Sequence, residues 1–372
     1  MKKICLFGTY NLNYVRNSTL RQGLLENGVR VVEVHEEVPN QRMELPEDYT
    51  LKTTVARVFR KLGCYVRLAK RYKEVSSSDV IVVLHPGHLD LPLAWLMSKF
   101  SGKKLIFDDS ISPYDTMFIA RSIADRTSLK AKLVKYGERF LTKLADRVFV
   151  DTPLMKTFLV SEVGVLEEKI FVIPLGANEK MYKPARIQHT SKNVSVLFFG
   201  LYNIMHGTEY IMEAIKILKS KKHISFTLIG EGHLKEKLVA FAKEHKLTNV
   251  KFVGFMPEAE LVKQIQNADI MLGVFSNSPL FQRVIPNKVF AAIACGKPLI
   301  TARLKPVSDY LRDKKDVYFC EKKNAGSLAD AIETVSEDRS LRETIAGNGY
   351  KAFKKNFSTK RIGRKFLEEI SI

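Results

Sequence analysis

Residues 272–303 read LGVFSNSPLFQRVIPNKVFAAIACGKPLITAR, and this stretch decides the fold. The letters predict a buried strand, a polar loop, a helix that begins near Pro286 and stops at a glycine, and an apolar strand at residues 298–301. Because that last strand is apolar on both faces, we expect a parallel sheet covered by helices, with the loop at its carboxyl edge. The helix start offers unpaired N–H groups, and Arg283 and Lys288 add positive charge beside it. The stretch therefore predicts a binding place for an anion.

The composition describes a two-domain protein with an anionic partner. The chain has 372 residues, of which 45% are apolar, and a mean hydropathy of −0.10. No apolar run approaches the roughly 18 to 20 residues that a spanning helix needs, and the N-terminal run reads as a first strand and not as a signal peptide. The four cysteines lack the spacing of a metal site, which favours a reduced, cytoplasmic compartment. The net charge of +20 calls for a nucleic acid, an acidic lipid or a phosphorylated substrate.

Strands and helices alternate in two successive runs, which predicts an α/β protein with two Rossmann-like domains. The first domain is expected at residues 1–183 and the second at residues 184–350, with a polar linker between their sheets. Residues 351–372 are expected to form a helix that packs back towards the first domain. Expected strands lie at residues 3–8, 29–34, 79–84, 104–108, 147–150 and 170–173, and at residues 194–199, 224–229, 250–253, 269–273, 298–301 and 317–320. Expected helices include residues 18–27, capped by Asn17 or Ser18, as well as 119–145, 208–219 and 234–244.

Residues 52–73 contain eight basic and no acidic side chains, with apolar residues at spacings of four and three. This pattern predicts a basic amphipathic helix or helix pair, broken near Gly63. One interpretation is attachment to an anionic membrane or a phosphate-bearing acceptor, and the other is an ordinary solvated face of a packing helix. The candidate membrane or acceptor residues are Arg57, Arg60, Lys61, Arg67, Lys70 and Arg71.

The segment DDSISPYDT follows the strand at residues 104–108. Carboxylates and hydroxyls at the exit of a parallel strand stand where such sheets bind ligands, although they can also cap turns and the long helix after them. The candidate catalytic residues are Asp108, Asp109, Tyr114 and Asp115.

The second half resembles the nucleotide-sugar domain of family 4 glycosyltransferases, which have the GT-B fold. The resemblance rests on the order and spacing of FFG with HG seven residues on, IGEG, VKFVGF, AD, and IPNKVF leading into ACGKP. The first half resembles the same family through GTY, RN, DDSISPYDT and DT, so that nearly the whole chain is covered. The resemblance implies two facing Rossmann-like domains with a cleft between them, and transfer of a sugar from a nucleotide donor with retention of anomeric configuration.

Two departures from the family pattern concern the donor. The arginine and lysine that usually follow the first strand of the second domain fall at Leu201 and His206. The paired glutamates that usually hold the sugar and the ribose fall at Arg283 and Ala291, and alanine offers no hydrogen bond. Arg283 and Lys288 are expected to restore the lost charge at the diphosphate. The candidate donor-binding residues are Gly8, Tyr10, Gly200, Tyr202, His206, Gly207, Gly230, Glu231, Phe255, Arg283, Pro286, Asn287 and Lys288.

Several of these residues also have plainer interpretations. His206 can be a turn residue instead of a phosphate ligand, since histidine binds phosphate well only when protonated. Gly230 serves a tight strand-to-helix turn in any case, and Glu231 can simply face water. No cofactor and no bound metal are expected, because helix N-termini and cations can stabilise a departing diphosphate.

The leading function is a glycosyltransferase of surface polysaccharide or glycolipid synthesis, cytoplasmic or peripheral on the inner face of the membrane. Its expected partners are a nucleotide-sugar, a glycan or lipid-linked acceptor and an anionic membrane. The alternative is a catalytically inactive partner subunit that binds a sugar or nucleotide. Nucleic-acid binding is not expected, because the sequence contains no RRM, KH or helix-turn-helix pattern. Its basic residues are also not interleaved with aromatic residues that could stack on bases.

Overall fold

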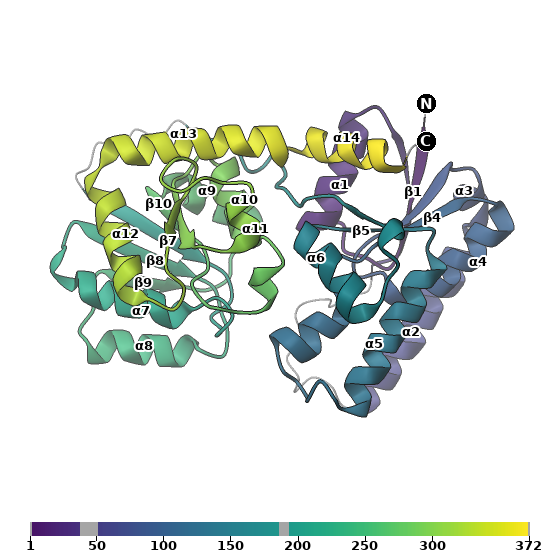
Figure 1. Ribbon diagram of the computed structural model, residues 1–372, viewed down its shortest axis with the longest axis horizontal. Helices are drawn as coiled ribbons and strands as arrows, with labels where there is room; N and C mark the ends of the chain where they lie inside the picture. The colour runs from purple at the N-terminus through teal and green to yellow at the C-terminus, as the bar shows by residue number, and fades with distance from the viewer. Residues whose placement is uncertain (1, 38–50, 186–192, 371–372) are drawn as a thin grey trace. The chain divides into compact units, whose positions relative to one another are not determined.

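The structure is a computed structural model that describes residues 2–37, 51–185 and 193–370, without the side chains of residues 51–59. The chain divides into two compact units (Figure 1). The first unit comprises Met1–Pro174 and Thr359–Ile372, and the second comprises Leu175–Ser358. The divisions fall at 174/175 and 358/359, where the sequence suggested 183/184 and 350/351. The linker residues join the second unit because Tyr182 donates to Glu258 at 2.9 Å and the Lys183 carbonyl accepts from Gln266 at 2.9 Å.

The first unit is built on a six-stranded parallel sheet in the order β2-β1-β3-β4-β5-β6. Its strands are nearly continuous runs of Val, Ile, Leu and Phe, because helices cover both faces of a parallel sheet. The register pairs Ile4 with Val31 on one side and with Val80 on the other. The strands are β1 (Lys3–Gly8), β2 (Arg30–His35), β3 (Val80–Val83), β4 (Lys104–Asp108), β5 (Arg147–Val150) and β6 (Ile170–Val172).

The helical segments of this unit are α1 (Val15–Glu26), α2 (Leu51–Lys70), α3 (Tyr72–Ser76), η2 (His88–Asp90), α4 (Leu91–Ser101), η3 (Asp115–Ala120), α5 (Leu129–Leu144), α6 (Pro153–Phe158), η4 (Leu159–Val163), η5 (Glu167–Lys169) and α14 (Thr359–Ile370).

Three expectations about these helices are wrong. α1 begins at Val15 without a side-chain cap, because the Asn17 amide donates to the Asn11 and His85 carbonyls at 3.0 and 2.8 Å. α2 is not broken at Gly63, since the apolar face of an amphipathic helix outweighs the roughly 1 kcal/mol cost of one glycine. The expected helix at residues 119–145 is two pieces, η3 and α5, because Ser128 caps α5 by accepting from the Ala131 N–H at 3.2 Å.

The C-terminal helix completes the core of the first unit. Ile362, Phe366 and Ile370 of α14 lie in the same buried cluster as residues of β1, β3, β4, β5 and β6. The Phe366 ring meets Phe149 edge-on with centroids 5.3 Å apart. Residues at the end of the chain therefore stabilise a sheet that begins at its start.

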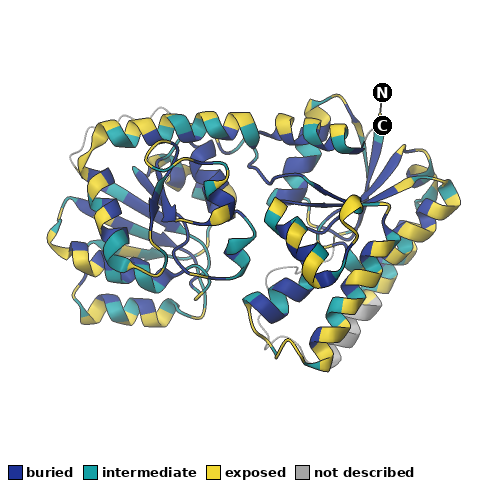
Figure 2. Cartoon of the chain, viewed as in Figure 1, coloured by how far each residue is buried: buried dark blue, intermediate teal, exposed yellow. Residues whose placement is uncertain are grey.

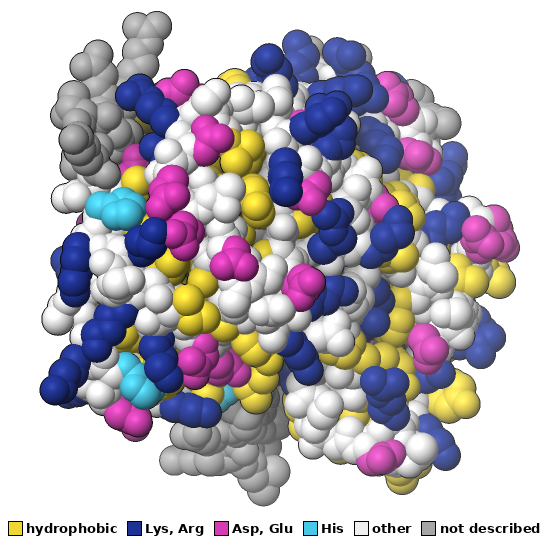
Figure 3. All heavy atoms as spheres, turned by 60° about the vertical axis from the view of Figure 1, so that its left-hand side comes forward, with side chains coloured by type: hydrophobic (Ala, Val, Ile, Leu, Met, Phe, Trp, Pro, Cys, Tyr) yellow, Lys and Arg dark blue, Asp and Glu magenta, His cyan; other side chains and the backbone are white. Residues whose placement is uncertain are grey.

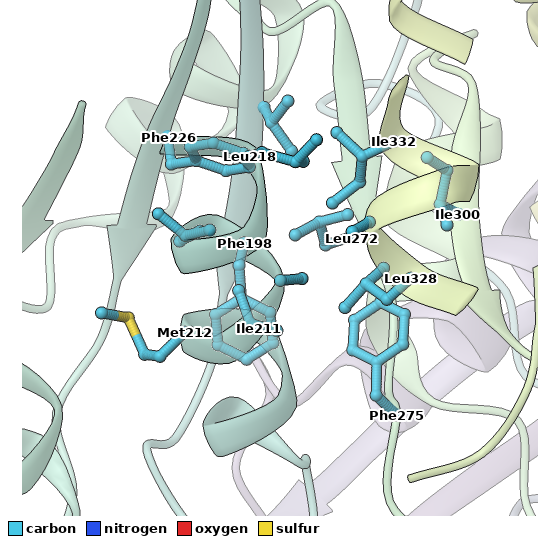
Figure 4. Packing of buried hydrophobic residues seen from close by; sticks show 14 of the residues in the cluster. Phe198, Ile211, Met212, Leu218, Phe226, Leu272, Phe275, Ile300, Leu328 and Ile332 are labelled. Carbon is cyan, nitrogen blue, oxygen red and sulfur yellow. The ribbon is translucent and has the colours of Figure 1, made fainter. Parts of the chain in front are cut away.

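The second unit repeats the design with a parallel sheet in the order β12-β11-β10-β7-β8-β9. Phe198, Leu272 and Ile300 of neighbouring strands pack against Ile211 of α7 and Ile332 of α12 (Figure 4). The strands are β7 (Val194–Phe199), β8 (Ile224–Ile229), β9 (Val250–Val253), β10 (Ile270–Leu272), β11 (Leu299–Ala302) and β12 (Tyr318–Cys320). The helical segments are α7 (Thr208–Ile217), η6 (Leu218–Ser220), α8 (Lys235–Glu244), α9 (Glu258–Asn267), η7 (Leu280–Gln282), α10 (Asn287–Ala294), α11 (Lys305–Ser308), α12 (Ala325–Glu337) and α13 (Arg339–Asn356).

Each sheet has a point where the strand order reverses: between β1 and β3 in the first unit, and between β7 and β10 in the second. Open parallel sheets bind ligands beside the carboxyl ends of the strands at such a point. The two candidate sites below lie at these edges. No helix of the described residues has the length and apolar character needed to cross a membrane.

Candidate functional site

Tight glycine turns shape the carboxyl edge of the second sheet. Gly200 follows β7 with a φ of +141°, and Gly230 follows β8 with a φ of +153°. A Cβ at Gly230 would lie 1.8 Å from the Gly200 carbonyl oxygen, and one at Gly232 would lie 2.4 Å from the Tyr202 carbonyl oxygen. Only glycine fits these positions, because a side chain at either one would collide with the backbone of the neighbouring turn.

The side chain of Lys288 lies beside the Gly200 turn. It is the second residue of α10 and is buried, yet its Nζ has no hydrogen-bond partner within the described residues. Nζ lies 4.3 Å from the centroid of the Phe198 ring, and a Cβ at Gly200 would lie 3.2 Å from Nζ. Burial lowers the pKa of Lys288 to about 7. An ammonium in such a position is costly until an anion reaches it.

His206 offers no positive charge at neutral pH. Its Nδ1 lies 2.7 Å from the Leu201 carbonyl oxygen, so the neutral ring donates there. Burial, and then the charge of Lys288, lower the pKa of His206 to about 3. The ring also stacks on Phe281 with centroids 5.6 Å apart. Of the two interpretations left open by the sequence, this geometry favours the turn residue.

Two buried hydroxyls accompany Lys288 at this edge. Thr208 Oγ1 begins α7 and Ser278 Oγ lies in the loop after β10, and neither has a hydrogen-bond partner in the described part of the chain. The loop and the helix start touch, because a Cβ at Gly207 would lie 2.6 Å from the Ser276 nitrogen. The edge therefore combines two helix N-termini, unused hydroxyls and one buried amine, a combination that suits a phosphate.

The remaining candidates of the second unit differ in position. Tyr202 is fully buried and donates to the Leu228 carbonyl at 2.7 Å, so its ring belongs to the core and not to an open site. Glu231 accepts from Lys235 at 2.6 Å, and the Phe255 ring is exposed. Arg283 is half-buried after η7. Pro286 directly precedes α10, and Asn287, its first residue, is exposed. Ala291 is buried inside the helix.

Asp108 ends β4 and is held by three groups. Its Oδ2 lies 3.0 Å from Arg16 Nε, while Oδ1 accepts from the Ser110 hydroxyl at 2.5 Å and from the Ser110 N–H at 3.2 Å. Arg16 also donates to the Ile173 carbonyl at 2.7 Å. Burial, partly offset by Arg16, raises the pKa of Asp151 to about 7 beside this pair. Asp108 is thus fully occupied by structural contacts within its own unit.

Asp109 belongs to a buried group with His88 and Glu138. His88 Nε2 lies 2.9 Å from Asp109 Oδ1, and one ligand atom from each of the three residues lies within 4.8 Å of the others. Asp109 Oδ2 and Glu138 Oε1 are buried without a hydrogen-bond partner among the described residues. Burial, and then the charge of Asp109, raise the pKa of Glu138. Burial is the largest single influence on the pKa of His88 and lowers it, but the charge of Asp109, the hydrogen bond to Asp109 and the charges of Glu138 and Asp108 together outweigh burial, and the pKa is raised.

This group can hold a proton between two carboxyls, offer hydrogen bonds to a ligand hydroxyl, or hold a cation with one nitrogen and two oxygen ligands. The sequence does not reveal this group, because its members come from three separate elements: His88 follows β3, Asp109 follows β4 and Glu138 belongs to α5. The sequence therefore suggested Asp109 but neither of its partners. A useful signal was the single acidic residue of α5, which interrupts an otherwise basic helix.

The other candidates of the first unit are packed into it. Tyr10 is buried against His35 with centroids 4.7 Å apart. A Cβ at Gly8 would lie 2.7 Å from Asp90 Oδ2. Tyr114 is buried, and its N–H donates to Glu138 at 3.0 Å. Asp115 is fully buried at the start of η3.

The basic residues of α2, and Arg71 directly after it, form several ion pairs within the first unit. Lys61 Nζ lies 3.5 Å from Asp90, Arg67 Nε lies 2.9 Å from Glu36, and Arg71 Nε lies 2.7 Å from Glu74. Arg60 and Lys70 are exposed, and the side chain of Arg57 lies outside the described residues. The expected basic face is therefore weaker than its composition suggested.

Comparison with known proteins gives the chemistry that fits this fold. Residues 182–352 match the family model described as glycosyl transferases group 1. An uncharacterized glycosyltransferase of Methanocaldococcus jannaschii is 24% identical over 84% of this chain and 82% of its own. The Campylobacter jejuni N,N'-diacetylbacillosaminyl-diphospho-undecaprenol alpha-1,3-N-acetylgalactosaminyltransferase is 25% identical over 59% of this chain and 60% of its own.

The structural comparison covers the whole chain. The crystal structure of Anabaena HepE in complex with UDP and glucose matches with a TM-score of 0.69 at 16% identity, over 100% of this chain and 99% of that chain. This likeness confirms the GT-B fold with its two parallel-sheet domains. The family match and the named relatives confirm the expected glycosyltransferase, while family 4 stays a prediction.

Proposed function

From the match of residues 182–352 to the glycosyl transferases group 1, we propose that this enzyme is a retaining transferase that uses a nucleotide-sugar donor. The acceptor is a glycan or a lipid-linked glycan of surface polysaccharide or glycolipid synthesis. One observation carries the donor part of the proposal: the Nζ of Lys288 is buried, without a hydrogen-bond partner among the described residues, at the point where the second sheet reverses its strand order.

Lys288 would supply to the diphosphate the positive charge that the family usually supplies from the turn after the first strand of the second domain. The resemblance places the usual arginine and lysine at Leu201 and His206, which carry no charge here. Lys288 Nζ nevertheless lies next to Gly200 and His206, as the 3.2 Å approach to a Gly200 Cβ and the lowered pKa of His206 indicate. A cation from α10 would thus reach the diphosphate from the other side of the same turn.

The chemistry that this position supports is stabilisation of a leaving nucleoside diphosphate. Negative charge grows on the leaving group as the sugar becomes oxocarbenium-like, and preorganised donors stabilise that charge most effectively. Lys288, once protonated, supplies the positive charge, and the Thr208 and Ser278 hydroxyls supply hydrogen bonds. The N-termini of α7 and α10 add their dipoles.

The nucleoside would be recognised by groups other than paired glutamates. Phe255 exposes its ring after β9, where a base can stack on it. Glu231, half-exposed beside Gly254, has a carboxylate for ribose hydroxyls. Since the Anabaena relative was crystallised with UDP and glucose, UDP-sugars are the first donors to test.

The acceptor would be handled by the first unit. Asp109, with His88 and Glu138 behind it, has the hydrogen-bonding capacity to hold a sugar hydroxyl. The Campylobacter relative is named for an acceptor linked through a diphosphate to undecaprenol. We therefore assign an acceptor of the same chemical class, which would bring the enzyme to an anionic membrane surface.

Basic side chains on the face shown in Figure 3 are interspersed with acidic ones and do not form a continuous basic track. This face, as far as its residues are described, therefore lacks the continuous track that a nucleic acid would need along its phosphates. The charge fits a phosphorylated substrate and a lipid surface better.

The decisive experiment is a thermal-shift panel of UDP, GDP and ADP and their sugars, followed by transfer assays with the sugars that bind. The wild type should be stabilised by at least one nucleotide, and the Lys288→Met variant should not. Lys237→Met, which changes an exposed lysine of α8, is the matched control and should respond like the wild type.

The anomeric configuration of the product, read by NMR, tests retention directly, and an inverted product would overturn it. Equal nucleotide binding by wild type and Lys288→Met would overturn the donor site. Binding of a nucleotide-sugar without hydrolysis or transfer to any acceptor would indicate the inactive binding subunit instead.

A further inference from the structure

Helix α5 presents a row of large apolar side chains to solvent. Leu129, Leu133, Tyr136 and Phe140 are exposed by 73%, 64%, 60% and 63%. Their spacings of four, three and four place them within an arc of roughly 60° on a helix of 3.6 residues per turn. Exposed apolar residues are ordinary when scattered, but a continuous row of them marks an interaction surface.

The row faces away from the first unit because the opposite side of α5 is buried. Ala131, Glu138 and Thr142 are the buried residues of the helix. Glu138 is fixed there by the Tyr114 N–H at 3.0 Å and by its place beside Asp109 and His88. Figure 2 shows buried and exposed residues alternating along α5. The helix therefore cannot rotate its apolar row inward without breaking the buried group.

Basic residues accompany the row. α5 carries Lys130, Lys132, Lys135, Arg139 and Lys143, and its single acidic residue is the buried Glu138. No ion pair forms to these five cations within the described part of the chain. The preceding turn adds Arg126 and one acid, Asp125, which accepts from the Thr127 N–H at 2.7 Å. The exposed face of α5 thus combines apolar and cationic side chains with no carboxylate of its own.

This composition fits a lipid bilayer better than a protein. The centre of a protein interface is depleted of lysine, whereas an interfacial membrane helix has lysines beside its apolar row. Lysine can lie along the apolar surface and extend its ammonium to the headgroups. The cations of α2 and the Arg71 that follows it, in contrast, are partly used in ion pairs with Asp90, Glu36 and Glu74.

We propose that α5 is the membrane-docking element of this enzyme, with Leu129, Leu133, Tyr136 and Phe140 inserted at the acyl boundary of an anionic bilayer and its lysines among the headgroups. The proposal deepens the proposed function, on whose lipid-linked acceptor it rests, and it moves the expected docking surface from α2 to α5. The same helix carries Glu138 on its inner face, so docking would place the Asp109 group one helix diameter from the lipid.

The test is co-sedimentation of the full chain with vesicles of phosphatidylcholine containing phosphatidylglycerol, and with vesicles of phosphatidylcholine alone. The wild type should bind the anionic vesicles, less at high salt, and bind the neutral vesicles weakly. The double variant Leu133→Gln, Phe140→Gln should lose about ten-fold or more in affinity. The triple variant Lys132→Gln, Arg139→Gln, Lys143→Gln should lose on the order of five-fold per charge.

Matched controls use other exposed residues. Leu166→Gln with Ile217→Gln removes two apolar side chains that are exposed by 52% and 55% elsewhere, and should leave vesicle binding unchanged. Arg60→Gln with Lys70→Gln tests α2, and this double variant should reduce vesicle binding less than the α5 variants do. Thermal shift with UDP, which reports the second unit, should be the same in all variants and separates a failure of docking from a failure of the donor site.

Three outcomes would overturn the proposal. They are absence of wild-type binding to anionic vesicles at low salt, unchanged binding by both α5 variants, and a wild-type dimer in solution that the Leu133→Gln, Phe140→Gln variant dissociates. The last outcome would assign the row to a second copy of this chain.

Discussion

Gly23 of α1 and Gly363 of α14 touch through their backbones: a Cβ at Gly363 would lie 2.1 Å from the Gly23 carbonyl oxygen. A Cβ at Gly23 would lie 2.3 Å from the Thr359 carbonyl oxygen and 2.8 Å from the Gly363 nitrogen. Thr359 also donates to Glu26, and Asn27 donates to the Lys360 carbonyl, at 2.6 and 2.8 Å. Small residues at the crossing let two helices from opposite ends of the chain meet closely.

Gly363→Ala should lower the free energy of unfolding by about 1 to 3 kcal/mol, because the added methyl group forces the two helices apart. Urea denaturation followed by circular dichroism measures the change. Gly347→Ala in α13 is the control, since a Cβ there meets nothing within 4 Å. Alanine is the better helix former, so this control should gain up to about 1 kcal/mol. Equal stability of the two variants would contradict the close crossing.

Lys288→Met should raise the thermal midpoint of the protein while weakening nucleotide binding. The free protein buries an amine that finds no hydrogen-bond partner in the described ranges of the chain, and methionine fills a similar volume without that cost. We expect a gain of about 1 kcal/mol or more in stability, and a loss of about 10- to 100-fold in UDP affinity through one missing charged hydrogen bond. Calorimetry and titration on the same sample check both signs. A variant that is less stable but binds normally would contradict the assignment.

Binding of UDP at pH 8 should take up protons from the buffer. The pKa of Lys288 is about 7 in the free protein, so the amine is mostly neutral at pH 8, and a diphosphate beside it raises that pKa. Titration calorimetry in two buffers of different ionisation enthalpy measures the uptake, which approaches one proton per site. Lys288→Arg, which stays charged at this pH, should abolish the uptake even where it binds. An uptake that persists in this variant would assign the proton to another group.

Glu138→Gln should flatten the dependence of stability on pH. The raised pKa of Glu138 means that the folded state keeps a proton that the unfolded state loses above about pH 4.3, so wild-type stability falls as the pH rises from there to the raised pKa and levels off above it. Glutamine cannot titrate, and its amide can donate to Asp109 Oδ2 in place of the carboxyl proton. Asp151, with its pKa raised to about 7, titrates in both proteins and cancels in the difference.

Urea midpoints at pH 5, 7 and 9 measure this effect. The wild type should lose up to about 1.4 kcal/mol per pH unit more than the variant between about pH 4.3 and the raised pKa of Glu138, and the difference should level off above that pKa. Parallel curves for the two proteins would show that Glu138 does not hold the proton.

The sequence predicted the sheets closely. β7, β8 and β9 match the expected residues 194–199, 224–229 and 250–253, because each strand is a short apolar run followed by a glycine or polar turn. The sequence predicted the helix boundaries less accurately: α1 starts before the expected cap, and α5 is separate from η3. These boundaries depend on contacts such as the Asn17 amide bonds to Asn11 and His85, which no local pattern reveals.

By itself, the sequence determined the two α/β domains and the resemblance to glycosyltransferases, and it predicted an anion site in residues 272–303, since these follow from periodicity, glycine placement and ordered motifs along the chain. Only the tertiary structure decided that Lys288 is buried with no hydrogen-bond partner in the part of the chain that it describes, that Tyr202 belongs to the core, and that Asp109 meets His88 and Glu138. It also decided that the apolar row of α5 points outward. The physical reason is that strand order and burial bring together groups far apart in the chain, and their charge and exposure depend on those neighbours.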